Sequence, residues 1–88
     1  MNWELHLRKR IKRHLLRFPQ KDQIYIAAGL KEIATNPYSG DIEKILGEEN
    51  VWRRRIGAYR IFYEIISQEK VIHVFRIERR TSKTYKKR

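Results

Sequence analysis

Four stretches of the chain have the pattern of β-strands, and in two of them, residues 2–7 and 59–66, hydrophobic and polar residues alternate as in a half-buried strand. The stretches cover residues 2–7, 51–56, 59–66 and 71–77. Two further stretches place apolar residues at helical spacings, and a proline follows each of them. The pattern therefore predicts one helix over residues 8–18, ended by Pro19, and a second from residue 20 to Asn36-Pro37.

The order of these elements indicates the fold class. The Gly57-Ala58 turn and the polar turn over residues 67–70 join the last three strands, so we expect consecutive strands to pair antiparallel. Residues 37–50 are rich in turn formers and acids, and we interpret them as a connection with a brief anchoring segment at Ile42, Ile45 and Leu46. The order βααβββ predicts an α+β fold, in which two helices cover one face of an antiparallel sheet and leave the other face partly open.

Arginines are concentrated on the predicted hairpin over residues 52–65. Successive side chains of a strand face opposite ways, so Arg53 and Arg55 share one face, about 7 Å apart along the strand. Arg60 lies on the next strand, on the same face as Phe62 and Glu64. A phosphate-sized anion could be held between the two strands. Arg54 shares the opposite face with Trp52 and Ile56, and we expect it to bend out of the core or to contact a partner.

Length and charge narrow the function classes. A chain of 88 residues is the size of a single domain, over residues 1–88. Its net charge of +11 favours nucleic acid, an acidic protein or an anionic membrane surface as partner. No apolar run reaches the length of a membrane span and no signal peptide is recognisable, so we expect a cytoplasmic protein. There is no cysteine, and His6, His14 and His73 are too far apart in the sequence for a recognisable metal site.

Three short motifs together carry a resemblance that covers almost the whole chain. The segment WRRRIGAYR at residues 52–60 is similar to the W-R-x-R-x-G-x-Y-R segment of the RelE/ParE superfamily of bacterial and archaeal toxins. Asn36-Pro37 with Gly40 is similar to the N-P-x-x-G bend that follows the second helix in that family. The basic tail ends near a tyrosine, Tyr85, as the family's tail does.

The resemblance to RelE-type members implies an activity. Those toxins are mRNA interferases, which cut the message in the ribosomal A site through attack of a ribose 2′-hydroxyl on the neighbouring phosphate, and they use no cofactor. Carried over by position, Arg53 and Arg55 match basic residues that are lysines in the prototype, and Arg60 matches an arginine that holds the scissile phosphate. Arg79 corresponds to the arginine that stabilises or protonates the leaving 5′-oxygen. Tyr85 corresponds to the tyrosine that stacks on a base of the message.

The general base is the point at which the sequence departs from the family. Guanidinium groups stay protonated, so arginines at positions 53 and 55 bind charge but do not accept protons. Glu64, Glu48 or Glu49 could replace the base, or the ribosome could supply part of the acid-base chemistry.

Two other functions stay open at this point. One is a ParE-like inhibitor of DNA gyrase that does not cut RNA, and the other is a non-catalytic, basic RNA-binding module. For a toxin, the resemblance implies a cognate antitoxin in a heteromeric complex, alongside the ribosome and mRNA as partners. An acidic antitoxin would complement the charge of the chain.

Overall fold

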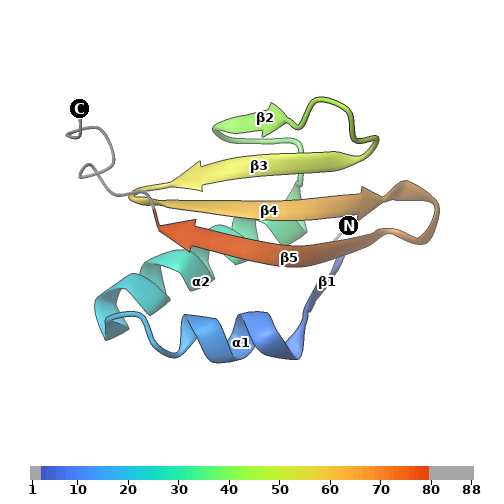
Figure 1. The fold of residues 1–88 in the computed structure, drawn as a ribbon. Coiled ribbons are helices and arrows are strands. Elements are labelled where there is room, and N and C mark those ends of the chain that lie inside the picture. Colours follow the sequence, from blue (N-terminus) through green and yellow to red (C-terminus); the bar gives the residue numbers. More distant parts are fainter. Residues whose placement is uncertain (1–2, 80–88) are drawn as a thin grey trace, which may run out of the picture.

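A computed structural model describes residues 3–79 of the protein. The elements follow one another as β1 (Glu4–Leu7), α1 (Lys9–Leu15), α2 (Gln20–Thr35), β2 (Ile42–Lys44), β3 (Val51–Ile56), β4 (Tyr59–Ile66), the 3₁₀-helix η1 (Ser67–Glu69) and β5 (Val71–Arg79). They form one five-stranded sheet in the order β1-β5-β4-β3-β2. Both α-helices lie on the same side of this sheet, and no helix within residues 3–79 covers the side that faces the viewer in Figure 1. The predicted α+β fold is confirmed.

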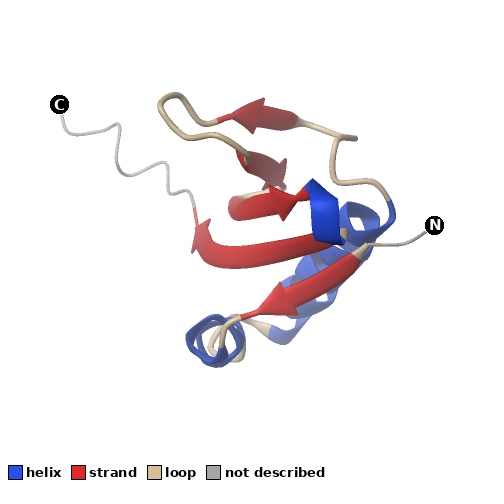
Figure 2. Ribbon diagram, turned by 90° about the vertical axis from the view of Figure 1, so that its right-hand side faces the viewer, coloured by secondary structure: helices blue, strands red, loops and turns tan. Residues whose placement is uncertain are grey.

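The sheet differs from the prediction at its two edges. β1 pairs in parallel with β5, with His6 opposite His73, so the sheet is mixed and the expectation of a purely antiparallel sheet is wrong there. The chain leaves β1 at one edge, crosses the covered face through both helices and reaches the opposite edge at β2. It then returns through β3 and β4 to β5, so the parallel pair is joined by all of these elements. Figure 2 shows the strands and the two helices as separate layers.

The other edge is the short strand β2, which the sequence pattern does not predict. Ile42 pairs with Arg54 and Lys44 pairs with Trp52, so part of the expected connection belongs to the sheet. Ile42 and Ile45 are half-buried as expected of an anchoring segment, but the side chain of Leu46 is 94% exposed. The anchoring prediction is therefore wrong for Leu46, because this residue lies in the turn at the sheet edge, where no other element covers it.

The first helix is shorter than predicted. It ends at Leu15, and the amides of Arg17 and Phe18 donate to carbonyl oxygens three residues earlier, at His14 and Leu15. Such tightened bonds are a common ending for a helix, here just before Pro19. Within residues 3–79, no helix is long and apolar enough to cross a membrane.

The core lies between α2 and the covered face of the sheet. On α2, Ile26, Leu30 and Ile33 are buried, at the helical spacing that the sequence predicts. On β4, Ile61, Tyr63 and Ile65 are buried, whereas Arg60, Phe62 and Glu64 face the open side. The predicted alternation of β4 is therefore confirmed. Burying these side chains is the main favourable contribution to folding, and it fixes which residues remain on the open face.

Candidate functional site

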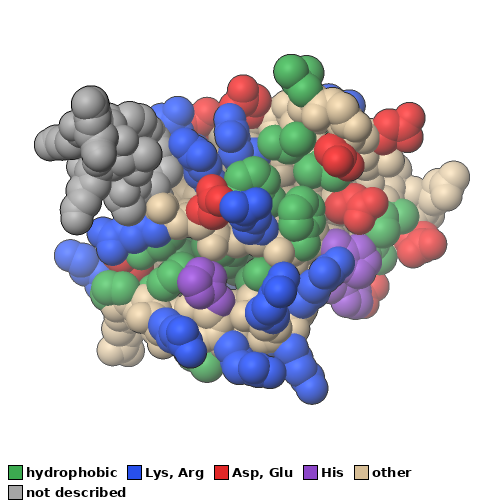
Figure 3. Space-filling model, in the orientation of Figure 1, with side chains coloured by type: hydrophobic (Ala, Val, Ile, Leu, Met, Phe, Trp, Pro, Cys, Tyr) green, Lys and Arg blue, Asp and Glu red, His purple; other side chains and the backbone are tan. Residues whose placement is uncertain are grey.

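Four arginines meet on the open face of the sheet. The register of β3 and β4 places Arg55 opposite Arg60 and Arg53 opposite Phe62. The register of β4 and β5 places Arg76 opposite Phe62. Side chains directly opposite one another have Cβ atoms about 5 Å apart, so a single anion can reach more than one guanidinium. We call this set the open-face cluster; it consists of Arg53, Arg55, Arg60, Phe62, Arg76 and Glu78. Figure 3 looks onto this face and shows basic side chains gathered over the left part of the sheet.

Phe62 lies at the middle of the cluster. Its ring is half-buried, and the guanidinium carbon of Arg76 is 5.4 Å from the ring centroid. The Phe75 ring lies 6.3 Å away on the neighbouring strand. An aromatic ring between arginines is an arrangement that can bind a base and its phosphate together.

A β-bulge in β5 brings Arg76 into the cluster. Phe62 pairs with Arg76 and Tyr63 pairs with Val74, which leaves Phe75 without a partner. Strict alternation from Val74 would direct Arg76 into the core, whereas the extra residue turns it to the open face. Neither Arg76 nor Glu78 stands out as a site residue in the sequence pattern or in the family motifs. A signal for them exists, because the buried residues Val74 and Ile77 are three positions apart instead of two.

Each arginine of the cluster lies beside a carboxylate of the same chain. Arg53 pairs with Glu43 of β2, and Arg55 Nε lies 3.5 Å from Asp41 Oδ2. Glu78 pairs with Arg76, and its Oε1 is 3.9 Å from Arg60 Nη1. These pairs are partly exposed, and such ion pairs contribute about 0.2 to 1 kcal/mol each. A phosphate could therefore displace Glu43 and Asp41 from their arginines at small cost.

The structure does not bring Arg79 to the other predicted arginines. Arg79 pairs with Tyr59 at the end of β5, and its guanidinium carbon is 5.8 Å from the Tyr59 ring. Tyr59 is buried on the helix-covered side, where its hydroxyl donates a 2.6 Å hydrogen bond to Asp22 of α2. Burial, and then the Asp22 hydrogen bond, raise the pKa of Tyr59. The predicted stacking residue Tyr85 lies outside the described residues.

The three carboxylates considered as a general base lie away from Arg60. Glu64 is four residues further along β4, opposite Val51 and His73, which is a separation of about 13 Å at the usual rise per residue. Glu48 and Glu49 lie in the turn that joins β2 to β3. None of the three is positioned beside Arg60.

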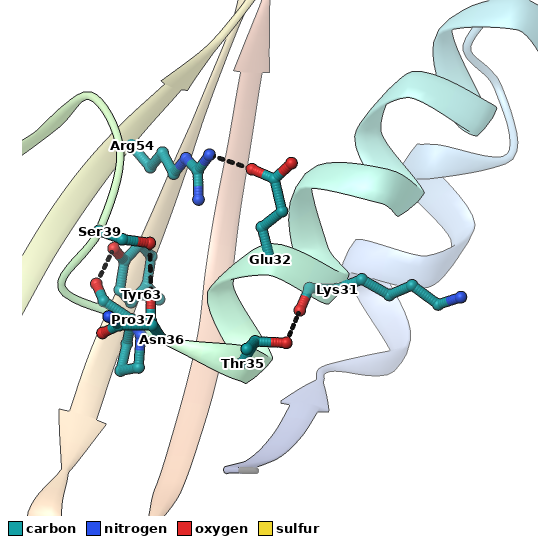
Figure 4. A network of polar contacts seen from close by, with 8 residues as sticks. All are labelled: Lys31, Glu32, Thr35, Asn36, Pro37, Ser39, Arg54 and Tyr63. Carbon is teal, nitrogen blue, oxygen red and sulfur yellow. Dashed lines mark hydrogen bonds and ion pairs between the residues drawn. The ribbon is translucent and has the colours of Figure 1, made fainter. Parts of the chain in front are cut away.

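Arg54 contributes to the packing of the helical layer on the sheet and is not part of the open-face cluster. It faces the covered side of the sheet, as predicted, but it does not bend out of the core: its side chain is largely buried where it pairs with Glu32 of α2 (Figure 4). Its guanidinium packs against Gly40, where a Cβ would come within 2.6 Å of Arg54 Cζ. The positive φ of Gly40, +85°, suits glycine as well. Arg54 therefore links α2, the following loop and β3 on the side opposite the cluster.

Two of the three histidines lie side by side in the fold. His6 and His73 lie on paired strands with ring centroids 5.4 Å apart, although they are far apart in the sequence. His14 packs against Phe18 on the helical side. Among the residues that the structure describes, no group of three or more histidine and acidic side chains could hold a metal ion.

Comparisons with known proteins agree with this fold. RelE of Pyrococcus horikoshii, solved in complex with RelB, has a TM-score of 0.80 at 21% identity and covers 93% of this chain and 99% of its own. Isolated Escherichia coli RelE has a TM-score of 0.79 at 17% identity, covering 94% and 90%. RelE1 of Methanocaldococcus jannaschii, a relative named as a RelE toxin, is 26% identical over 83 residues, which are 91% of this chain and 92% of that protein.

A family model identifies the chain more directly. The model of the ParE toxin of type II toxin-antitoxin systems, parDE, matches residues 6–83, which include both helices and the whole sheet except the first residues of β1. The chain therefore belongs to the ParE toxin family of type II toxin-antitoxin systems, within the RelE/ParE superfamily that its sequence motifs resemble.

Proposed function

We propose that this toxin is a ribosome-dependent endoribonuclease that cleaves mRNA in the A site through attack of a ribose 2′-hydroxyl on the adjacent phosphate. The observation that carries the proposal is the direct pairing of Arg55 with Arg60 on the open face, with Arg53 on the same side. The phosphorane formed in this reaction gains negative charge, which fixed guanidiniums stabilise through charge-assisted hydrogen bonds. Residues 1–88 would form one toxin domain that acts in the cytoplasm without a cofactor.

The predicted residues take different roles in this proposal. Arg53 and Arg55 bind the backbone of the message, and Arg60 holds the scissile phosphate. Arg79 would turn from Tyr59 toward the leaving 5′-oxygen once RNA is bound, because its pairing with an aromatic ring at the end of β5 is weak. Tyr85 would stack on a base of the message.

A second candidate is a ParE-like inhibitor of DNA gyrase. It is supported by the family model that matches the chain and by the separation of Arg79 from the other arginines. This function needs no general base. We rank it second because a ParE-like activity gives no role to the arginines that converge on the open face.

We also propose a cognate antitoxin as partner. The solved RelE structures from P. horikoshii and M. jannaschii are complexes with RelB. A chain with net charge +11 would be complemented by an acidic antitoxin segment, and opposite charges speed association. Co-expression with the neighbouring reading frame and purification through a tag on that protein test this partner.

The activity is tested by mapping 5′ ends of a defined mRNA in a reconstituted translation reaction, with and without ribosomes. We expect cuts within the A-site codon that need ribosomes. Arg60→Ala should reduce the rate about 10² to 10³-fold, the usual effect of losing one preorganised donor. Arg79→Ala tests the leaving-group role in the same assay. Lys31→Ala removes an equal charge from the exposed face of α2 and should leave the rate unchanged. An uncut message together with gyrase-dependent DNA cleavage would favour the second candidate.

A further inference from the structure

The open-face cluster contains a carboxylate that the sequence motifs do not assign. Glu78 of β5 lies opposite Arg60, and its side chain is 32% exposed. One oxygen, Oε2, pairs with Arg76. The other, Oε1, lies 3.9 Å from Arg60 Nη1, which is longer than a hydrogen bond. This oxygen therefore faces the guanidinium that would hold the scissile phosphate and still has room to accept a hydrogen bond.

The chemistry of the proposed reaction needs such a group. Attack by a ribose 2′-hydroxyl is assisted by a base that removes its proton, and the arginines at positions 53, 55 and 60 stay protonated. A histidine cannot serve, because His73 lies on β5 opposite Glu64, about 13 Å along the sheet from the level of Arg60. Its neighbour His6 lies beyond it on β1, and His14 packs on the helical side. The acceptor must come from the carboxylates around the cluster.

The other carboxylates near the arginines are less suitable. Asp41 and Glu43 lie at the β2 edge of the sheet, where their side chains are 68% and 66% exposed, about twice the exposure of Glu78. Arg55 and Arg53 separate them from Arg60. Glu64 points to the open side about 13 Å along β4. Of the described carboxylates, Glu78 alone is directly opposite Arg60.

We propose that Glu78 is the general base of this toxin, an inference that rests on the endoribonuclease function proposed above. Its carboxylate takes the proton of the 2′-hydroxyl as the 2′-oxygen forms a bond to phosphorus. The bond from phosphorus to the 5′-oxygen breaks, which leaves a 2′,3′-cyclic phosphate on one fragment. The leaving 5′-oxygen takes a proton from water, and protonated Glu78 returns its proton to solvent.

The charged groups around Glu78 fit this role. Arg76 holds one carboxylate oxygen and fixes the orientation of the side chain, while Arg60 faces the other oxygen and Arg55 is the next cation across the sheet. When a phosphate binds to Arg60 and Arg55, it neutralises the cations on one side of Glu78. The carboxylate then remains beside the bound phosphate, anchored by Arg76.

Glu78→Gln separates this role from a purely electrostatic one, because glutamine keeps the shape but cannot accept the proton. We expect the single-turnover rate of A-site cleavage to fall about 10² to 10⁴-fold, the usual contribution of a general base. Ribosome binding should be unchanged or tighter, since Arg60 and Arg76 lose a competing carboxylate. Glu64→Gln, the matched control on the same face, should cut like the wild-type protein.

A second variant provides an independent test. Glu78→Ala should recover part of its cleavage rate in formate, which supplies a small carboxylate, but not in chloride at the same ionic strength. If Glu78→Gln cuts at the wild-type rate or faster, Glu78 only masks the arginines, and its role as base is wrong while the endoribonuclease function stands. If the wild-type protein itself leaves the message intact, both proposals fail.

Discussion

The hydroxyl of Tyr63 donates a hydrogen bond of 2.8 Å to the carbonyl oxygen of Pro37, and both groups are buried. The bond ties the middle of β4 to the loop that follows α2 (Figure 4). The same loop contains Gly40, against which Arg54 packs. One buried hydroxyl therefore holds the segment that carries the chain from the helical layer to the edge strand β2.

The burial of the Tyr63 hydroxyl predicts a loss of stability in alkali. Burial raises the pKa of Tyr63 to about 12, although nearby Arg54 lowers it in part. An unfolded tyrosine loses its proton near pH 10, so between pH 10 and 12 the unfolded chain binds fewer protons than the folded one, and stability falls as pH rises. Tyr63→Phe should cost about 1 to 3 kcal/mol at neutral pH, since it leaves the Pro37 carbonyl unpaired. Denaturant unfolding at several pH values measures both effects.

A second tyrosine variant provides a control for the loss of stability in alkali. Tyr25→Phe makes the same change on α2, where the side chain is 55% exposed, and should alter neither the neutral nor the alkaline stability. Burial also raises the pKa of Tyr59, which acts in the same direction as Tyr63. If Tyr63→Phe loses stability between pH 10 and 12 as steeply as the wild-type protein, the loss does not come from Tyr63.

The ion pair between Arg54 and Glu32 should respond unequally to changes at its two ends. The Arg54 side chain is only 11% exposed, and its Nε and Nη1 atoms have no hydrogen-bond partner in the described residues, whereas Glu32 is 61% exposed. Glu32→Gln leaves a buried cation without its counter-charge and should destabilise by about 1 to 2 kcal/mol, less than for a fully buried pair. Arg54→Met, similar in length and apolar, should be nearly neutral. Urea unfolding measures the free energy of unfolding of both variants. An equal decrease in the two would mean that the buried charge of Arg54 is not the cause of the instability.

Gly29 permits the close approach of α2 to β3. A Cβ built on Gly29 would lie 2.1 Å from Ile56 Cδ1, inside the core. Alanine normally stabilises a helix relative to glycine by about 1 kcal/mol, but here Gly29→Ala should destabilise by about 1 to 3 kcal/mol through overpacking. The thermal midpoint of unfolding measures the loss.

A double variant tests the reason for that loss. Ile56→Val removes the methyl group that would clash, so the combination with Gly29→Ala should be more stable than the sum of the single effects predicts. Strict additivity would mean that Ile56 is not the group displaced.

Phe62 should contribute to RNA binding through its ring. Phe62→Leu keeps an apolar side chain between Arg53 and Arg76 but removes the aromatic face, so affinity for single-stranded RNA should fall by about 1 to 3 kcal/mol. Fluorescence anisotropy with a labelled oligonucleotide measures the change. Phe18→Leu, on the helical side against Tyr59, is the control and should leave RNA affinity unaltered. Equal affinities for Phe62→Leu and the wild-type protein would mean that no base stacks on this ring.

The sequence predicted most of the layers and one half of the candidate site. Alternation on β3 and β4 placed Arg53, Arg55 and Arg60 together, because neighbouring strands in a hairpin have their register set by the short turn between them. It missed β2, since three residues in a polar connection carry too few apolar positions to show a period. The sequence also did not predict on which face of the sheet Arg79 lies, because this depends on the length and register of β5.

The sequence by itself determined which residues enter the core and which arginines share a strand face, because these follow from local periodicity and from the exclusion of charge from the interior. Only the tertiary structure decided that the bulge at Phe75 turns Arg76 outward, and that Glu78 lies opposite Arg60 while Arg79 lies on the other side. The physical reason is that a single extra residue reverses the facing of every later side chain in a strand. Whether a strand accepts that residue depends on its neighbours in the folded sheet.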